Sequence, residues 1–163
     1  MKKEKKHLTK DEALSKLQRY CAYQDRCHQE VRNKLIELGV YGLDLENVIT
    51  ELISENFLNE ERFARSYAGG KFRVKRWGRV RIKLELRKRR ISAYCIKKGL
   101  SEIGDQDYRT TLELLLEKKN NLLTERNTFK KNGLLAKYAI NKGFESFLVW
   151  EIIKEKWPLY SKK

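Results

Sequence analysis

The sequence has little proline and little cysteine. The only proline among its 163 residues is Pro158, so almost no position forbids a helix. The three cysteines, Cys21, Cys27 and Cys95, are an odd and scattered set. Such a set does not fit a disulfide framework or the paired ligands of a zinc site. We expect three small thiols that are buried or half-buried, and neither disulfides nor a bound metal.

Long apolar runs are also missing. The longest stretch without a charged residue has six residues, whereas a membrane helix needs roughly 20 apolar residues. The N-terminus is basic, but no apolar segment follows it, so no secretory signal is expected. We therefore predict a cytoplasmic protein that does not associate with a membrane.

Acidic residues are outnumbered by basic ones. The chain has 37 Lys and Arg against 22 Asp and Glu, a formal net charge of +15. This excess favours a polyanion or an acidic surface as partner. Apolar residues make up 40% of the chain, which is enough for a packed core. The composition therefore predicts a folded protein with a negatively charged partner.

Helical spacing of apolar residues begins at Thr9 and continues almost to the C-terminus. Thr9 and Glu12 have the spacing of a capping box, in which each side chain satisfies a backbone N–H of the first turn. Further helix starts and ends are predicted from residues that favour those positions. The expected N-caps are Asp25, Asp44, Asn59, Ser92 and Thr124, and the expected glycine ends are Gly39, Gly104 and Gly143.

The apolar pattern repeats along the chain. Ile91, Ile96 and Leu100 have the same spacing as Phe144, Val149 and Ile153, which lie 53 residues later. Tandem units of this kind stack on one another. We predict an all-α protein of tandem three-helix repeats that form an elongated, curved rod. The predicted parts are a disordered basic tail (1–8) and three-helix repeats at 9–58, 59–104 and 105–163.

Residues 71–86 also fit a second structure. Apolar and basic residues alternate there on both sides of Trp77 and Gly78, which is typical of a β-hairpin. An isolated two-stranded hairpin is only marginally stable, and the repeat needs a helix at this place. We therefore predict a helix, with local strand or loop character near 70–78.

An ordered series of residues over about 15–100 consists of Arg26, Glu30-Val31, Leu35, Gly39, the run from Phe57 to Ala64, Gly78, Ile82, Glu85-Leu86, Ile91, Ile96 and Leu100. This series resembles the RecX family, whose members regulate the recombinase RecA. Three features depart from the family's usual pattern: Asn59 stands where an acidic residue is common, Arg89-Arg90 replaces a glycine before Ile91, and Gly69-Gly70 is unusual in the middle of a helix. Agreement continues more weakly through Phe144 and Ile153.

The resemblance implies a fold of tandem three-helix repeats and no enzymatic activity. It also implies that the chain lies in the groove of the RecA–DNA filament, where it limits filament growth or promotes disassembly. On this basis we expect a monomer that acts in recombination, DNA repair and the SOS response. It would bind no cofactor, and its partners would be the RecA filament and single- or double-stranded DNA.

The residues that we expect to contact the partner lie in one segment, 71–90. It holds eleven cations and a single anion, Glu85, so its formal charge is +10. Arginine predominates, and its planar guanidinium suits phosphates and carboxylates. Trp77 either stacks on a base or anchors the core. The predicted contact residues are Lys71, Arg73, Lys75, Arg76, Trp77, Arg79, Arg81, Lys83, Arg87, Lys88, Arg89 and Arg90.

No catalytic, metal or cofactor residues are predicted. Gly69-Gly70-Lys71 resembles the end of a P-loop but lacks its first glycine and its final Ser or Thr. Asp105 and Asp107 are interpreted as residues of a first helical turn, as are Glu60 and Glu61. Two alternatives to the regulator remain open: a plain DNA- or RNA-binding module that uses the same arginines, and a nuclease with magnesium-dependent cleavage.

Overall fold

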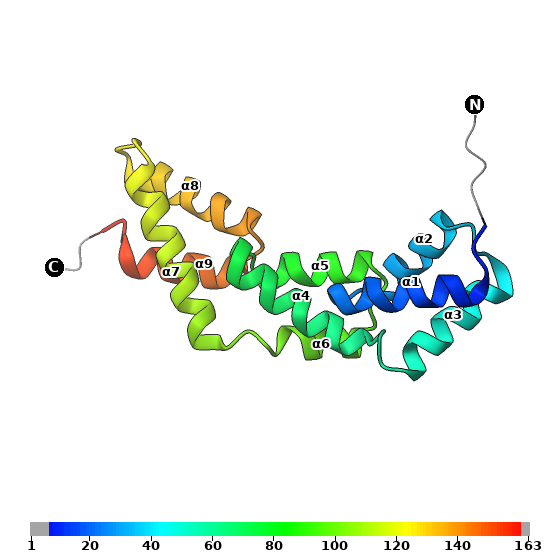
Figure 1. Cartoon of the computed structure of the whole chain (residues 1–163). Helices are drawn as coiled ribbons and strands as arrows, with labels where there is room; N and C mark the ends of the chain where they lie inside the picture. The colour runs from blue at the N-terminus through cyan, green and yellow to red at the C-terminus, as the bar shows by residue number, and fades with distance from the viewer. Residues whose placement is uncertain (1–6, 161–163) are drawn as a thin grey trace, which may run out of the picture. The chain divides into compact units, whose positions relative to one another are not determined.

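The computed structural model describes residues 7–160, which form nine α-helices and no strand (Figure 1). The predicted all-α class, built of three-helix units, is confirmed. Residues 71–75 and 79–86 are helical, with a turn at 76–78 between them, and they do not form a hairpin. The helices are α1 (Lys10–Tyr23), α2 (His28–Glu37), α3 (Gly42–Ser54), α4 (Glu60–Lys75), α5 (Arg79–Lys88), α6 (Ala93–Leu100), α7 (Asp105–Leu122), α8 (Thr128–Asn141) and α9 (Ser146–Lys156).

The chain divides into two compact units by its internal contacts. Unit 1 consists of the chain up to Ser66 together with Arg87–Gly99. Unit 2 consists of Tyr67–Leu86 together with the chain from Leu100 onward. Helix α4 therefore begins in unit 1 and ends in unit 2, and α5 begins in unit 2 and ends in unit 1.

The core of unit 1 lies between α1, α2 and α3, which pack on one another. Leu17, Leu35 and Leu52 come from these three helices and are fully buried. The capping box at the start of α1 is confirmed: Glu12 N donates to Thr9 Oγ1 at 3.3 Å, and Thr9 N donates to the Glu12 carboxylate at 3.0 Å. Local capping and three apolar faces together account for this unit.

Arg62 fastens the start of α4 to the rest of unit 1. Its guanidinium donates to the Asp25 carboxylate at 2.8 Å and to the carbonyl oxygens of Asn56 and Phe57 at 3.0 and 3.1 Å. Asp25 was predicted to cap α2, and that prediction is wrong. The N-cap of α2 is Cys27, whose N–H donates to the Glu30 carboxylate at 2.8 Å. Asp25 serves a contact between distant segments instead.

Several other predicted helix ends are confirmed and three are wrong. Gly104 does not end α6, which stops at Leu100; it is the N-cap of α7 and has an extended backbone with φ of −67°. Asn59 and Ser92 accept from Arg62 N and Cys95 N at 2.9 and 3.2 Å, as N-caps do. Asp44 is not a cap, because α3 already begins at Gly42. Thr124 is not one either, because Asn127 accepts from Lys130 N at 3.0 Å and α8 begins at Thr128. Gly39 and Gly143 have the predicted left-handed backbone, with φ of 77° and 98°.

The core of unit 2 lies between α7, α8 and α9, which also pack on one another. Tyr108 is at its centre, with its ring 5.0 Å from that of Phe144 and 5.8 Å from that of Phe72. Leu112, Leu135 and other apolar side chains fill the remainder. Because Phe72 lies on α4, this core also fixes the second half of α4, which begins the basic segment.

The predicted disordered tail, residues 1–8, lies outside the described residues except for His7 and Leu8. His7 Nδ1 is 3.1 Å from the carbonyl oxygen of Gly39, and Leu8 packs against the core of unit 1. Among the described helices, none is both long and apolar enough to span a bilayer.

Candidate functional site

The basic segment, residues 71–90, comprises the end of α4, a short turn and α5. Helix α4 ends at Lys75, and Arg76 then takes a left-handed backbone with φ of 56°. Trp77 N donates back to Lys71 O at 3.3 Å, which closes the end of the helix. The turn 76–78 thus separates two helices that both carry cations.

This turn is held against the α8–α9 connection within unit 2. Gly78 N donates to Lys142 O, and Val80 N donates to Gly143 O, each at 2.9 Å. The backbones approach so closely that a Cβ added to Gly78 would lie 2.1 Å from Gly143 O. Only glycine fits at residue 78, so the start of α5 has a fixed place in the unit.

Trp77 is half-buried and contacts two cations of the segment. The Arg81 guanidinium carbon lies 4.1 Å from the centre of the indole, and Lys71 Nζ lies 5.1 Å from it. Both are cation–π contacts. In this arrangement the indole orients Lys71 and Arg81.

Arg79 makes its contacts inside the protein. Its guanidinium stacks on the Tyr108 ring at 4.2 Å and donates to Ile103 O at 2.8 Å and to the Asp105 carboxylate at 2.6 Å. Its backbone N–H donates to the Tyr108 hydroxyl at 3.0 Å. Tyr108 in turn donates to the Glu145 carboxylate at 2.6 Å. Arg79 therefore joins α5 to α7 and is less available to a partner than its neighbours.

Most of the other cations in the segment are exposed. Lys71 and Arg89 are half-buried. Unit 2 contributes the exposed cations Arg73, Lys75, Arg76, Arg81 and Lys83, and these five side chains are the exposed basic set to which we refer below. The other exposed cations of the segment, Arg87, Lys88 and Arg90, belong to unit 1.

Lys142 joins this region from a distant part of the chain and was not among the predicted contact residues. Its Nζ donates to Lys75 O at 3.3 Å. Burial, together with the positive charge of nearby Arg81, lowers the pKa of Lys142. A bound anion would relieve this crowding of positive charge. Lys142 directly precedes Gly143, but no local sequence pattern linked it to the basic segment.

The sequence features that suggested catalysis have structural explanations. Gly69-Gly70-Lys71 lies inside α4, so its backbone N–H groups do not form a phosphate-binding loop. Asp105 and Asp107 lie in the first turn of α7, as predicted. The three cysteines are buried and unpaired with one another, as predicted. No cluster of three potential metal ligands occurs within residues 7–160.

A family model and several relatives match this chain. The model of the RecX second three-helix domain matches residues 59–100. A regulatory protein RecX of Clostridium perfringens (strain 13 / Type A) is 30% identical over 122 residues, which is 74% of this chain and 57% of the relative. The chain thus spans little more than half the length of that relative. A regulatory protein RecX of Prosthecochloris aestuarii is 26% identical over 88% of this chain and 92% of its own length.

Solved structures agree with these relatives. The crystal structure of RecX from Lactobacillus salivarius superimposes with a TM-score of 0.81 and 25% sequence identity. The match covers 90% of this chain and 95% of that one. The matched domain, the relatives and the shared fold agree that this chain is similar to RecX regulatory proteins in sequence and in fold.

Proposed function

We propose that this chain is a non-catalytic regulator of the RecA recombinase. It binds in the groove of the RecA–DNA filament and limits extension of the filament or promotes its disassembly. The observation that carries the proposal is the exposed basic set, which lies on two helices and the turn between them in a chain that matches the RecX second three-helix domain. Such a set suits the phosphates and acidic side chains of a nucleoprotein filament.

Apolar residues on α5 favour a partner that includes protein. Val80 and Leu84 are 52% and 51% exposed, and they lie one turn apart beside Arg81 and Lys83. Phosphate groups would gain nothing from these two side chains. A protein surface that is both acidic and apolar would bury them and pair with the cations. A filament offers such a surface together with DNA.

Regulation requires a difference in affinity between two states of the filament. If the chain binds the growing and the disassembling states with equal affinity, it does not change the balance between them. We therefore propose that the exposed basic set recognises a groove whose shape differs between these states. Bound in that groove, the chain acts by occupying space and changing populations, with no chemical step of its own.

The alternative is a stand-alone DNA- or RNA-binding module in the cytoplasm that uses the same arginines. Salt dependence separates the two functions. Binding to single strands through phosphates alone weakens with salt at a log–log slope of roughly −0.7 for each contact. Contacts with a protein surface add affinity that does not come from the release of counterions by phosphates, so this part of the affinity does not follow the same slope.

The experiment measures binding of the fluorescently labelled chain to RecA filaments on single-stranded DNA, and to the same DNA without RecA, as salt rises. The test variant carries Arg73→Glu, Arg76→Glu and Lys83→Glu. A control with the same charge change carries Lys16→Glu, Lys118→Glu and Lys130→Glu, all at exposed positions. We expect the test variant to lose at least tenfold in filament affinity and the control to keep most of it.

Filament binding should persist at a salt concentration where free DNA binding is lost. If the two salt dependences coincide, the plain nucleic-acid-binding module is the better account. If the test variant binds filaments as the wild type does, the exposed basic set is not the contact surface.

A further inference from the structure

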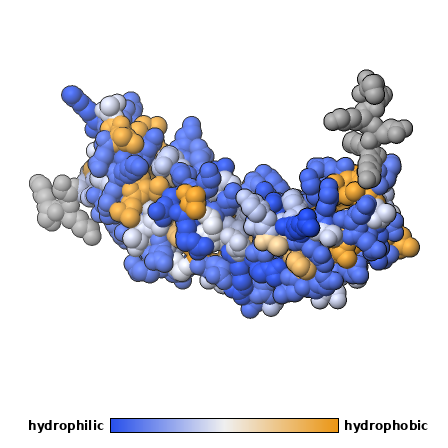
Figure 2. Space-filling model, viewed as in Figure 1, coloured by the Kyte–Doolittle hydropathy of each residue, from blue (hydrophilic) through white to orange (hydrophobic). Residues whose placement is uncertain are grey.

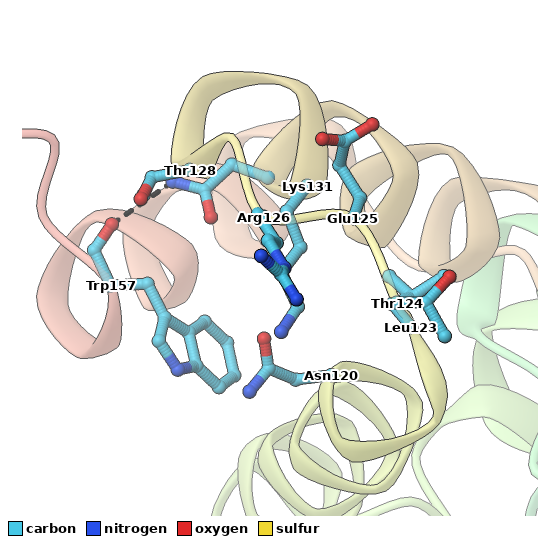
Figure 3. Close-up of a pocket in the computed structure, with 9 residues that line it drawn as sticks. Asn120, Leu123, Thr124, Glu125, Arg126, Thr128, Lys131 and Trp157 are labelled. Carbon is cyan, nitrogen blue, oxygen red and sulfur yellow. Dashed lines mark hydrogen bonds between the residues drawn. The ribbon is translucent and has the colours of Figure 1, made fainter.

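A polar hollow lies in unit 2, between the C-terminal end of α9 and the connection from α7 to α8. It has a volume of about 440 Å³, within the range of roughly 300–1,000 Å³ that is usual for small-ligand sites. Asn120, Arg126, Lys131 and Trp157 are among the residues that line it. Figure 3 shows the Arg126 and Lys131 side chains reaching toward the Asn120 amide, with the Trp157 indole at the flank.

Three polar side chains of this hollow are not used by the fold. The side chains of Asn120, Arg126 and Lys131 make no hydrogen bond or ion pair with any other residue in the described range. Glu125 also lines the hollow, but its carboxylate accepts from Asn127 N at 3.0 Å and points away from Arg126 and Lys131 in Figure 3. Donors and two positive charges therefore converge on the space, and Glu125, the one acid of its lining, is directed away from them.

Trp157 is held in place by its backbone. Its carbonyl oxygen accepts from the Asn132 amide at 2.9 Å, and its N–H donates to Ile153 O at 2.8 Å. Asn132 is a buried polar residue, so the first bond fixes the end of α9 firmly. The half-buried indole thus presents a preorganised flat apolar wall beside the cations.

A second hollow continues past the indole. It has a volume of about 400 Å³ and shares Asn120 and Trp157 with the first. The two hollows therefore form one path along the Trp157 indole, with space on either side of the ring. This suits a chain of nucleotides better than one isolated small molecule.

We propose that this hollow binds an unpaired nucleotide of a single strand. The base lies against the Trp157 indole, and its polar edge meets the Asn120 amide, which offers both a donor and an acceptor. The phosphate pairs with Arg126 and Lys131 near the start of α8. The site needs no recombinase, so it stands or falls separately from the proposed filament binding.

The test uses a protein whose only tryptophan is Trp157, made by Trp77→Phe and Trp150→Phe. Its fluorescence is followed during titration with an eight-residue oligothymidylate, with thymidine monophosphate and with inorganic phosphate. We expect quenching by the oligothymidylate and none by phosphate. Quenching by the monophosphate at the same concentration would identify a free nucleotide as the ligand instead of a strand, and would still place a base on the indole.

Variants show whether the lining residues contribute. Asn120→Asp and Lys131→Gln should each weaken the quenching titration by about 5- to 100-fold. Lys130→Gln is the matched control, because Lys130 is exposed on the same helix and does not line the hollow. The proposal would be overturned if neither the oligothymidylate nor thymidine monophosphate quenched the Trp157 fluorescence, while fluorescence anisotropy showed that the oligothymidylate still binds the protein. Equal effects of Lys130→Gln and Lys131→Gln would overturn it as well.

Discussion

Residues of the same type have different roles within the basic segment. Arg79 is packed on Tyr108 and bonded to Ile103 O, whereas Arg73 and Arg76 are exposed. Composition alone predicted all of them as contact residues, because a count of charges does not reveal internal partners. The internal partners of Arg79 come from α7 and the residues before it, more than twenty positions along the chain.

Tyr108 links three elements of unit 2 through one hydroxyl. It accepts from Arg79 N at the start of α5 and donates to Glu145 before α9. Burial raises the pKa of Tyr108, and the hydrogen bond to Glu145 raises it further, so the phenol stays protonated. We expect Tyr108→Phe to lower the free energy of unfolding by about 1–3 kcal/mol, because a buried N–H and a carboxylate lose their partner. Urea unfolding measures this change.

Tyr160→Phe is the control for that variant, since Tyr160 is 86% exposed. It should leave the unfolding free energy almost unchanged. Equal stability of Tyr108→Phe and the wild type would show that the hydroxyl network does not hold α5 in place.

The cysteines give a prediction about pH. Burial raises the pKa of the Cys21 thiol to about 11, from an ordinary value of 9.0. The folded protein therefore keeps this proton more tightly than the unfolded chain does. The stability that this provides is fully present below pH 9 and is lost as the pH rises from about 9 to 11.

We expect the native protein at pH 8 to react slowly with Ellman's reagent and the urea-unfolded protein to react at once. Burial raises the pKa values of Cys27 and Cys95 too, so all three thiols should be protected. Fast release of one full equivalent of thiolate by the native protein would contradict this description of the core.

At the scale of helices, apolar spacing accounts for the inner face of α5, whereas residue type alone predicted helix ends less reliably. Ile82 and Leu86 are fully buried and Val80 and Leu84 are exposed, as helical spacing requires. The capping residues Asp25 and Asp44 were chosen by residue type alone. Arg62 recruits Asp25, and Arg62 lies 37 positions away in the sequence. No local pattern contains that contact.

Lys142 shows the same limit at the candidate site. It reaches Lys75 O because the turn 76–78 bonds to the α8–α9 connection. The two glycines that allow this approach are Gly143 and Gly78. The sequence predicted Gly143 only as a helix end, and it placed Gly78 only between two alternating runs. Their pairing is a property of the packed unit, so the sequence placed the basic segment correctly on helices and missed the lysine beside it.

Leu84 and Leu86 offer a matched test of the α5 faces. Leu86→Asp places an unpaired carboxylate in the core of unit 2, which we expect to cost several kcal/mol and to unfold that unit. Leu84→Asp changes the same residue type at a position that is 51% exposed, and it should leave the helical content intact. Circular dichroism during heating compares the two. A fully helical, stable Leu86→Asp protein would mean that the inner face is misassigned.

For the whole molecule, the sequence repeat predicts an elongated rod of stacked three-helix units. A compact chain of 163 residues has a radius of gyration of about 15 Å. Tandem stacking requires a clearly larger value. We expect small-angle X-ray scattering of the monomer to give one, whereas a radius near that of a compact globule would contradict the predicted shape.

The surface of the whole chain suits an anionic partner. Figure 2 shows a largely hydrophilic face, with apolar patches where α7 and α8 lie. The net charge of +15 raises the rate of encounter with polyanions at low salt. Charge alone does not choose between free DNA and a nucleoprotein filament, so the central claim needs a measurement on the filament itself.

That measurement is the DNA-dependent ATPase of RecA on single-stranded DNA, recorded together with filament length, with and without this chain. We predict that substoichiometric chain lowers the ATPase rate and shortens the filaments. The variant with Arg73→Glu, Arg76→Glu and Lys83→Glu should do neither, whereas the variant with Lys16→Glu, Lys118→Glu and Lys130→Glu should act as the wild type does. Unchanged ATPase and filament length at saturating wild-type chain would contradict the account.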